Sequence, residues 1–285
     1  MEIVVRVPGS CGELVQGSLS GEPFLVTCPI DCYTEVRISD AIDGIHGLGR
    51  KSLNALERTM IFLGEETFPW GLQLLSDLPH GKGMASSSAD IGAVVAGVSL
   101  AYGIPLSSNQ MLQIAAAIEP TDGIFLPSVV RLNYLAGVVQ ETFPVMPALR
   151  LTIFDFGGEI DTIVFNQQTD IKKKTASKER LMERALALLR NGTEEGIAEA
   201  ATISAFAHQS ILPKLELKNI FTAAQEMGAL GISIAHSGTV IGILWNSRAS
   251  SNCLNRGIAR IMKYFPQLSF VRQARLIAGG IYRIR

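Results

Sequence analysis

Two glycines and three consecutive serines lie close together in the chain, directly before a small-residue apolar segment that is typical of a helix. Gly81 and Gly83 belong to the loop, and Ser86 to Ser88 begin the helical segment. The first turn of a helix leaves backbone N–H groups unpaired and carries the positive end of the helix dipole, so it can bind an anion such as phosphate. Serine hydroxyls can bind phosphate oxygens or reach a hard cation. This chemistry indicates a triphosphate with magnesium, and an ordinary turn followed by Ser86 as an ordinary N-cap is the structural alternative.

The two commoner phosphate-binding patterns do not describe this loop. The Walker pattern needs a lysine followed by Ser or Thr, whereas Lys82 is followed by Gly83. The dinucleotide-binding fingerprint needs three glycines at a fixed spacing, which the loop lacks.

Two carboxylates stand three residues apart where a later helix is predicted to end. Ser107 or Ser108 caps this helix, and Pro120 disfavours helical geometry at Glu119. Acids at this spacing are commonly just solvated. Beside a phosphate loop, however, one carboxylate can hold magnesium while the other, here Asp122, orients or deprotonates a hydroxyl.

The serine loop resembles the phosphate loop of the GHMP small-molecule kinases, such as galactokinase, homoserine kinase and mevalonate kinase. The family pattern is Pro-x-x-x-Gly-Leu-Gly-Ser-Ser-Ala, and this chain departs from it with Met84 for Leu, Ala85 for the second Gly and a third serine. The resemblance implies that the loop binds ATP. The implied nucleotide contacts are Pro79, Gly81, Lys82, Gly83, Met84, Ala85, Ser86, Ser87 and Ser88.

The same resemblance assigns roles to the two acids. It implies that Ser87 and Glu119 hold Mg²⁺ and that Asp122 is the catalytic acid-base residue, although some members, homoserine kinases among them, lack that acid. The sequence does not tell which of the three serines touches the metal. Lys82 and the turn at residues 237–239 are expected to stabilise the charge that develops during phosphate transfer.

Two further segments are similar to GHMP motifs, and both have a structural alternative. The first, Pro8-Gly9-Ser10-Cys11-Gly12-Glu13-Leu14-Val15-Gln16-Gly17, could be an ordinary hairpin or bulge. The second, Ala235-His236-Ser237-Gly238-Thr239, lies between two apolar strands and could be an ordinary hairpin turn. The amino-acid sequences of these two segments and of residues 27–33 most resemble one branch of the family, the L-threonine kinases of cobalamin synthesis.

An amino acid acceptor needs a partner for its ammonium and another for its carboxylate. Glu13 or Asp31 could meet the first, and Arg131 the second. The expected substrate contacts are Ser10, Cys11, Gly12, Glu13, Asp31, Arg131, His236, Ser237, Gly238 and Thr239.

Composition limits the other classes of function. The chain has 285 residues and a net charge of −1, which gives no basic field for nucleic acid. No apolar stretch reaches the roughly 20 residues that span a bilayer, and the acidic start does not suit a signal peptide, so we expect a cytoplasmic protein without a membrane partner. Four cysteines and four histidines form no tight pair, which indicates neither a zinc site nor a disulfide framework. Lys172–Lys174 is read as a solvated loop.

The chain is therefore expected to be an α+β protein with the two-lobed GHMP kinase fold. The resemblance implies a ribosomal S5 domain 2-like N-terminal lobe at residues 1–148 and a ferredoxin-like C-terminal lobe at residues 149–285. Local patterns predict a strand at residues 2–7 that ends at Pro8-Gly9 and another at residues 34–38. They predict helices at residues 52–63, 91–102, 178–190, 193–209, 217–227 and 250–264, and further strands at residues 149–154, 162–165, 268–277 and 281–285.

The predicted function is ATP-dependent phosphorylation of the hydroxyl of a small molecule, L-threonine for preference, to give O-phospho-L-threonine for the aminopropanol side chain of cobalamin. Homoserine or mevalonate is the alternative acceptor. A catalytically silent ATP-binding protein and a non-kinase enzyme on the same fold are the alternatives from other classes. The sequence leaves the oligomeric state open, a homodimer included.

Overall fold

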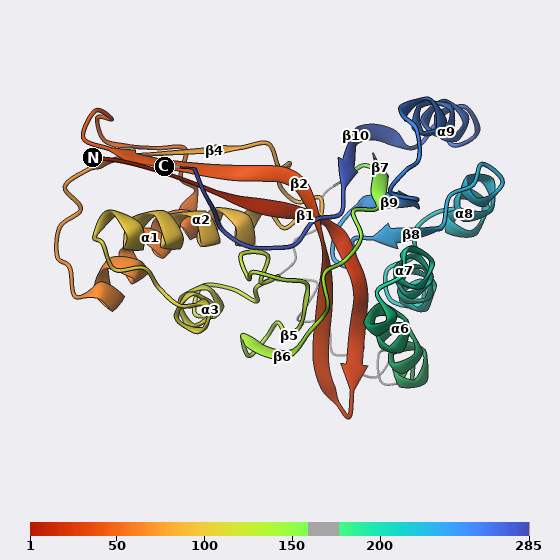
Figure 1. Ribbon diagram of the computed structural model, residues 1–285, viewed down its shortest axis with the longest axis horizontal. Coiled ribbons are helices and arrows are strands. Elements are labelled where there is room, and N and C mark those ends of the chain that lie inside the picture. Colours follow the sequence, from red (N-terminus) through yellow and green to blue (C-terminus); the bar gives the residue numbers. More distant parts are fainter. Residues whose placement is uncertain (159–176, 285) are drawn as a thin grey trace.

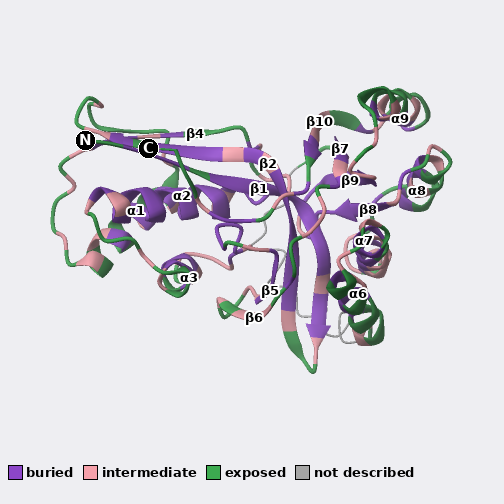
Figure 2. Ribbon diagram, in the orientation of Figure 1, coloured by how far each residue is buried: buried purple, intermediate pink, exposed green. Residues whose placement is uncertain are grey.

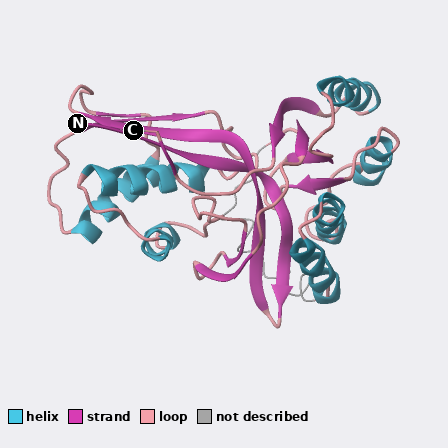
Figure 3. Cartoon of the chain, viewed as in Figure 1, coloured by secondary structure: helices cyan, strands magenta, loops and turns pink. Residues whose placement is uncertain are grey.

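The structure is a computed structural model, and it describes residues 1–158 and 177–284. In this part of the chain one continuous sheet runs through the molecule in the order β10-β7-β9-β8-β1-β2-β4-β3 (Figure 1). Helices α1 to α3 pack on the part of the sheet nearer the two chain ends, and helices α6 to α9 cover the other part (Figure 3). The predicted α+β class is confirmed.

Two long antiparallel strands form the centre of the sheet. β1 (Glu2–Leu19) and β2 (Glu22–Ser39) are buried along most of their length (Figure 2). The prediction that Pro8-Gly9 ends the first strand is wrong, because a register shift between these residues absorbs the proline, which has no N–H to donate. β1 therefore continues past Glu13 and also pairs with β8.

The first half of the sheet is completed by β4 (Gly71–Ser76) and by β3 (Ile45–His46). The helices that pack against it are α1 (Arg50–Leu63), α2 (Ser86–Ala101) and α3 (Ser108–Ala116). α2 is apolar on all sides, so it is stable only when it is buried on all sides, and nearly every residue in it is buried. Its position in the core fixes where its N-terminus opens.

The second half of the sheet contains β7 (Arg150–Asp155), β8 (Gly231–Ile234), β9 (Val240–Trp245) and β10 (Ser269–Arg275). Its helices are α6 (Glu179–Asn191), α7 (Glu194–His208), α8 (Leu217–Gln225) and α9 (Ser251–Tyr264). Thr193 and Ser250 cap α7 and α9 through their hydroxyls, which accept hydrogen bonds from backbone N–H groups in the first turn. The helices predicted in this half therefore agree with the structure within a few residues.

Three shorter strands complete the sheet. β5 (Val130–Asn133) pairs with β2 and with β6 (Val138–Thr142), and β11 (Tyr282–Arg283) pairs with β1 near Val5. The chain thus returns to its first strand after passing through the second half. The division at residue 148 stays a prediction.

The structure tests some of the remaining sequence predictions and does not describe the residues of others. The strand predicted at residues 162–165 and the basic segment at residues 172–174 lie outside the described residues. All four cysteines are free thiols, and Cys253 is the partly exposed one. None of the helices described has the length and apolar character needed to cross a membrane.

Candidate active site

A pocket of about 570 Å³ lies where the N-termini of α1 and α2 meet the end of α3. Four segments supply its wall: the serine loop, the start of α1, the acidic turn after α3 and the turn between β8 and β9. The lining residues are Glu13, Gly49, Arg50, Lys51, Ser52, His80, Gly81, Gly83, Met84, Ala85, Ser86, Ser87, Ser88, Asp90, Glu119, Pro120, Asp122 and Ser237. The predicted loop and the predicted acidic pair therefore share one pocket.

The carbonyl groups of the serine loop are held on the side away from the pocket. The hydrogen bonds run from Ser10 N to Met84 O (3.0 Å), Gly12 N to Gly83 O (3.2 Å), Thr239 N to Lys82 O (2.9 Å) and Val240 N to Lys82 O (3.2 Å). Because the carbonyls face backwards, the N–H groups at the start of α2 are left for an anion in the pocket.

The turn between β8 and β9 lies in direct backbone contact with this loop. A Cβ atom on Gly238 would come within 2.3 Å of Lys82 O and 2.4 Å of the Gly83 Cα. A Cβ on Gly83, which has a φ of +80°, would lie 2.3 Å from the Cβ of Ala235. Only glycines allow this approach, so the first and third motifs build the back of the phosphate loop.

The three serines have different surroundings. The N-cap of α2 is Ala85, in a left-handed conformation and without a side-chain cap, so the alternative of Ser86 as an ordinary N-cap is wrong. The hydroxyl of Ser88 donates to the Asp122 carboxylate (3.3 Å) and accepts from the Asp122 N–H (3.1 Å). The Ser87 hydroxyl is buried and has no hydrogen-bond partner among the described residues. Ser87 therefore carries a polar atom in the pocket wall that no described residue satisfies.

The acidic turn places its carboxylates in two different environments. Glu119 forms an ion pair with the ammonium of Lys51, which lies in the first turn of α1. Asp122 is partly buried, and its removal from solvent together with the carboxylates Glu13 and Glu119 raises its pKa to about 7. Asp122 is therefore close to half-ionised at neutral pH, which suits a group that accepts a proton.

These residues fit Mg²⁺ and a triphosphate. Mg²⁺ is usually held by one or two carboxylates together with substrate phosphates rather than by a cage of protein ligands. The unpartnered Ser87 oxygen and the Glu119 carboxylate in the same pocket match that pattern. Within residues 1–158 and 177–284 no group of three His, Cys, Asp or Glu side chains could hold a metal.

Glu13 is the residue of the first motif that reaches the pocket. It is 6% exposed, and burial raises its pKa to about 7 although the backbone N–H of His236 and the charge of Lys214 oppose that shift. The influence of Glu13 on the pKa of Asp122 puts the two carboxylates within electrostatic range of each other. The pocket thus holds Glu13 as a further carboxylate in addition to Asp90, Glu119 and the candidate base Asp122.

Several residues predicted for the site lie elsewhere. Lys82 points its ammonium to the Asp155 carboxylate (2.8 Å) and the Gly158 carbonyl (2.7 Å), and it does not line the pocket. Asp31 accepts a hydrogen bond from the backbone of Arg275 (2.7 Å), and Arg131 lies 3.6 Å from Glu141. The following predicted residues do not line the pocket either: Pro79, Ser10, Cys11, Gly12, His236, Gly238 and Thr239.

Seven pocket residues were not anticipated: Gly49, Arg50, Lys51, Ser52, His80, Asp90 and Pro120. A sequence signal existed for two of them. Arg50 and Lys51 occupy the first turn of α1, where the helix dipole disfavours cations, so their placement needs a negatively charged partner. Asp90 gave no such signal, and its contact with the Thr34 hydroxyl (2.7 Å) depends on tertiary packing.

Comparison with known proteins places this geometry in a family. Residues 51–126 match the GHMP kinases N terminal domain. An L-threonine kinase of Salmonella typhimurium is 26% identical over 98% of this chain and 94% of its own length, and an L-threonine kinase of Citrobacter freundii is 26% identical over 85% of each chain.

The solved structures that resemble this fold agree with the sequence matches. Mevalonate kinase of Methanococcus jannaschii superposes with a TM-score of 0.73 at 13% identity, covering 97% of this chain and 99% of that one. Homoserine kinase of Cytophaga hutchinsonii gives a TM-score of 0.72 at 21% identity, covering 99% of this chain and 97% of that one. The predicted two-lobed kinase fold is confirmed.

The sequence matches indicate a phosphotransferase that uses an alcohol group as acceptor. The chain is similar to the GHMP kinases, which act on small alcohols, and this class implies ATP as the phosphate donor.

Proposed function

We propose that this kinase phosphorylates the hydroxyl of L-threonine and that its product, O-phospho-L-threonine, supplies the aminopropanol side chain of cobalamin. The observation that carries the proposal is a further carboxylate in the pocket: Glu13 lines it together with Asp122, within electrostatic range, and can pair with the ammonium of an amino acid acceptor. The two L-threonine kinases described above support the same acceptor. Cytoplasmic location and homodimer formation stay predictions from the sequence.

The residues of the pocket divide the work of phosphate transfer. The N–H groups at the start of α2 bind the ATP phosphates, and Ser87 and Glu119 would hold Mg²⁺, which would supply neutralisation of the phosphate charge. Asp122 orients the acceptor hydroxyl through its carboxylate. The hydroxyl oxygen forms a bond to the γ-phosphorus, the bond between that phosphorus and ADP breaks, and the hydroxyl proton goes to Asp122.

Lys82 is not among the residues that line the pocket. Its ion pair with Asp155 connects the phosphate loop to the end of β7. Burial raises the pKa of Asp155, but the hydrogen bonds from Lys82, Thr239 and the Gly157 N–H and the charge of Lys82 outweigh it together, so this pKa lies below its usual value. We propose that Lys82 holds the loop in place rather than contacting the transferred phosphate.

A comparison of four acceptors, namely L-threonine, L-homoserine, L-serine and mevalonate, tests the proposed substrate directly. With saturating Mg²⁺ and ATP, kcat/KM for L-threonine should exceed that for mevalonate by at least about tenfold, since mevalonate has no ammonium to pair with Glu13 and a charged hydrogen bond contributes roughly 1.5–3 kcal/mol. L-threonine should also be preferred over L-homoserine and L-serine, which carry the same ammonium but present the hydroxyl differently. ADP release in a coupled assay measures each value. Equal values for all four acceptors would end the claim for threonine, and ATP binding without turnover would favour the silent alternative.

The pH dependence provides a second test. Asp122 and Glu13 must both be ionised to work, and each has a folded-state pKa of about 7. We therefore expect log kcat/KM for the acceptor to fall as pH drops below 7, with a slope that approaches two because two protons are taken up. The profiles are measured from pH 5 to 9 at saturating ATP for wild type, Asp122→Asn and Glu13→Gln. The slope should be smaller by one proton in each variant than in wild type. An unchanged slope in a variant contradicts the role proposed for the residue that it replaces.

A further inference from the structure

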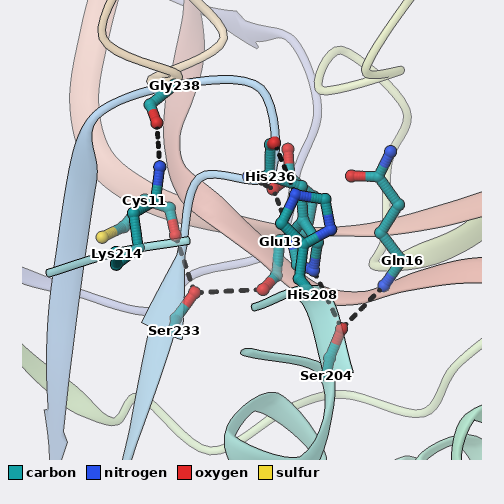
Figure 4. A network of polar contacts seen from close by, with 9 residues as sticks. All are labelled: Cys11, Glu13, Gln16, Ser204, His208, Lys214, Ser233, His236 and Gly238. Carbon is teal, nitrogen blue, oxygen red and sulfur yellow. Dashed lines mark hydrogen bonds and ion pairs between the residues drawn. The ribbon is translucent and has the colours of Figure 1, made fainter. Parts of the chain in front are cut away.

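A buried polar network lies behind the pocket wall at Glu13 (Figure 4). One oxygen of this carboxylate, Oε2, accepts two hydrogen bonds from the same residue, His236: one from its backbone N–H (2.8 Å) and one from ring atom Nδ1 (2.8 Å). His236 is fully buried and does not line the pocket. It therefore reaches the pocket only through Glu13.

The other neighbours of the imidazole fix which ring nitrogen carries the proton. Ser204 Oγ lies 3.1 Å from Nε2 and itself accepts a hydrogen bond from the backbone N–H of Gln16 (3.0 Å), so its own proton is free to go to Nε2. Nε2 then accepts and Nδ1 donates to Glu13. The carbonyl of His236 is held in turn by Nε2 of His208 (2.7 Å).

The charges around the imidazole keep it neutral in this arrangement. Burial, reinforced by the positive charge of Lys214, lowers the pKa of His236 to about 3. The ammonium of Lys214 donates to the carbonyl of Gly238, in the same turn as His236, and so provides the positive charge near Glu13. His236 acts as a neutral donor with one defined orientation.

The second oxygen of the Glu13 carboxylate has no donor in this network. Both hydrogen bonds to the carboxylate go to Oε2, and no hydrogen bond among the described residues goes to Oε1. Since Glu13 lines the pocket, Oε1 is the atom available to a substrate. A carboxylate fixed through one oxygen presents the other in a constant direction, which lowers the cost of ordering it when a cation binds.

We infer that His236 is a positioning residue for the acceptor: it fixes Glu13 so that the remaining carboxylate oxygen binds the ammonium of the substrate. This inference rests on the proposed amino acid acceptor. It replaces the direct substrate contact that the sequence suggested for His236, and it explains why a histidine rather than another buried side chain stands in a turn that also contacts the phosphate loop.

The test compares His236→Leu, which removes the ring donor, with His236→Asn, whose amide nitrogen can donate from about the position of Nδ1. We expect His236→Leu to weaken L-threonine binding by about 10- to 100-fold, the effect of losing a hydrogen bond to a charged group, and His236→Asn to restore most of it. Titration calorimetry without nucleotide gives the Kd for L-threonine. The Kd for ATP should change less than about threefold in both variants, because His236 does not reach the nucleotide contacts.

An acceptor without an ammonium separates positioning from general damage. For 3-hydroxybutyrate, kcat/KM should be nearly equal in wild type and His236→Leu, whereas the value for L-threonine should fall. Equal losses for both acceptors, a parallel loss of ATP affinity, or wild-type threonine binding in His236→Leu would each overturn the inference. Thermal unfolding of every variant shows whether a loss comes from the fold.

Two further measurements distinguish this inference from the proposed function. Glu13→Gln should weaken threonine binding at least as much as His236→Leu. If Glu13→Gln weakens threonine binding and His236→Leu does not, the positioning role of His236 is refuted while the proposed acceptor stands. If the wild-type protein binds no threonine, the proposed acceptor itself is refuted. The ¹⁵N spectrum of labelled histidine tests the contact without any acceptor. It should show His236 as the neutral Nδ1–H tautomer between pH 5 and 8, and the opposite tautomer or a protonated ring would refute the positioning role.

Discussion

Replacing Asp122 by asparagine should lower kcat by about 10²- to 10⁴-fold, the range that a positioned general base contributes. The amide is close in shape to the carboxylate and can still contact the Ser88 hydroxyl, but it cannot take the proton of the acceptor. The Kd for ATP should stay within about threefold of wild type, because the N–H groups at the start of α2 are unchanged. Single-turnover phosphate transfer and equilibrium nucleotide binding measure the two effects separately.

Asp40→Asn is the matched control for that experiment. Asp40 pairs with the N-terminal ammonium on the surface, its side chain is 62% exposed, and it does not line the pocket, so the same change of group should leave kcat unaltered. If Asp122→Asn keeps most of its turnover, Asp122 is not the base and the reaction relies on positioning of the hydroxyl alone. If ATP binding falls together with kcat, the substitution has disturbed the phosphate loop.

Replacing Gly83 by alanine should weaken ATP binding by more than about tenfold and destabilise the fold by roughly 2–5 kcal/mol, from left-handed backbone strain plus overpacking. The new Cβ would lie 2.3 Å from the Cβ of Ala235 and 2.9 Å from the Cα of Gly238. The phosphate loop and the turn behind it would have to separate, so the N–H groups at the start of α2 would lose their alignment. Urea denaturation and ATP titration measure the two losses.

Gly21→Ala isolates the strain from the steric conflict. Gly21 has the same φ of +80° at the turn between β1 and β2, but a Cβ there meets no atom within 4 Å. It should cost only the backbone term of about 1–2 kcal/mol and leave ATP affinity unchanged. Equal ATP affinities for the two variants would show that the contact between loop and turn does not shape the nucleotide site.

The sequence predicted those parts of the site whose signals are local. Glycines, serines and the acids after a proline-terminated helix are adjacent in the chain, so Ser87, Glu119 and Asp122 could be named from spacing and family resemblance. Lys51 could not, because its partner Glu119 is 68 residues away and only the packing of α1 near α3 brings them together. The misplaced strand end at Pro8 has a similar origin: a bulge, stabilised by pairing with β2, overrides a local stop signal.

Sequence patterns also could not tell the front of the phosphate loop from its back. The motif at Ser10 to Glu13 and the one at Ala235 to Thr239 both lie against the loop, yet only Glu13 and Ser237 reach the pocket. The others bond to loop carbonyls or are buried behind them. Which side of a strand faces a ligand depends on register, and here three register irregularities along β1 decide it.

The pairing of β11 with β1 has a consequence for how the molecule is made. Val5 and Arg6 on β1 find their partners in Arg283 and Tyr282, so one edge of the first half stays open while the whole second half is being translated. An exposed strand edge can recruit another chain, so nascent molecules are open to mispairing until ribosomes release residues 282–283. Refolding of full-length protein, in which that partner is present from the start, should therefore aggregate less than synthesis at the same concentration of chains arrested before β11.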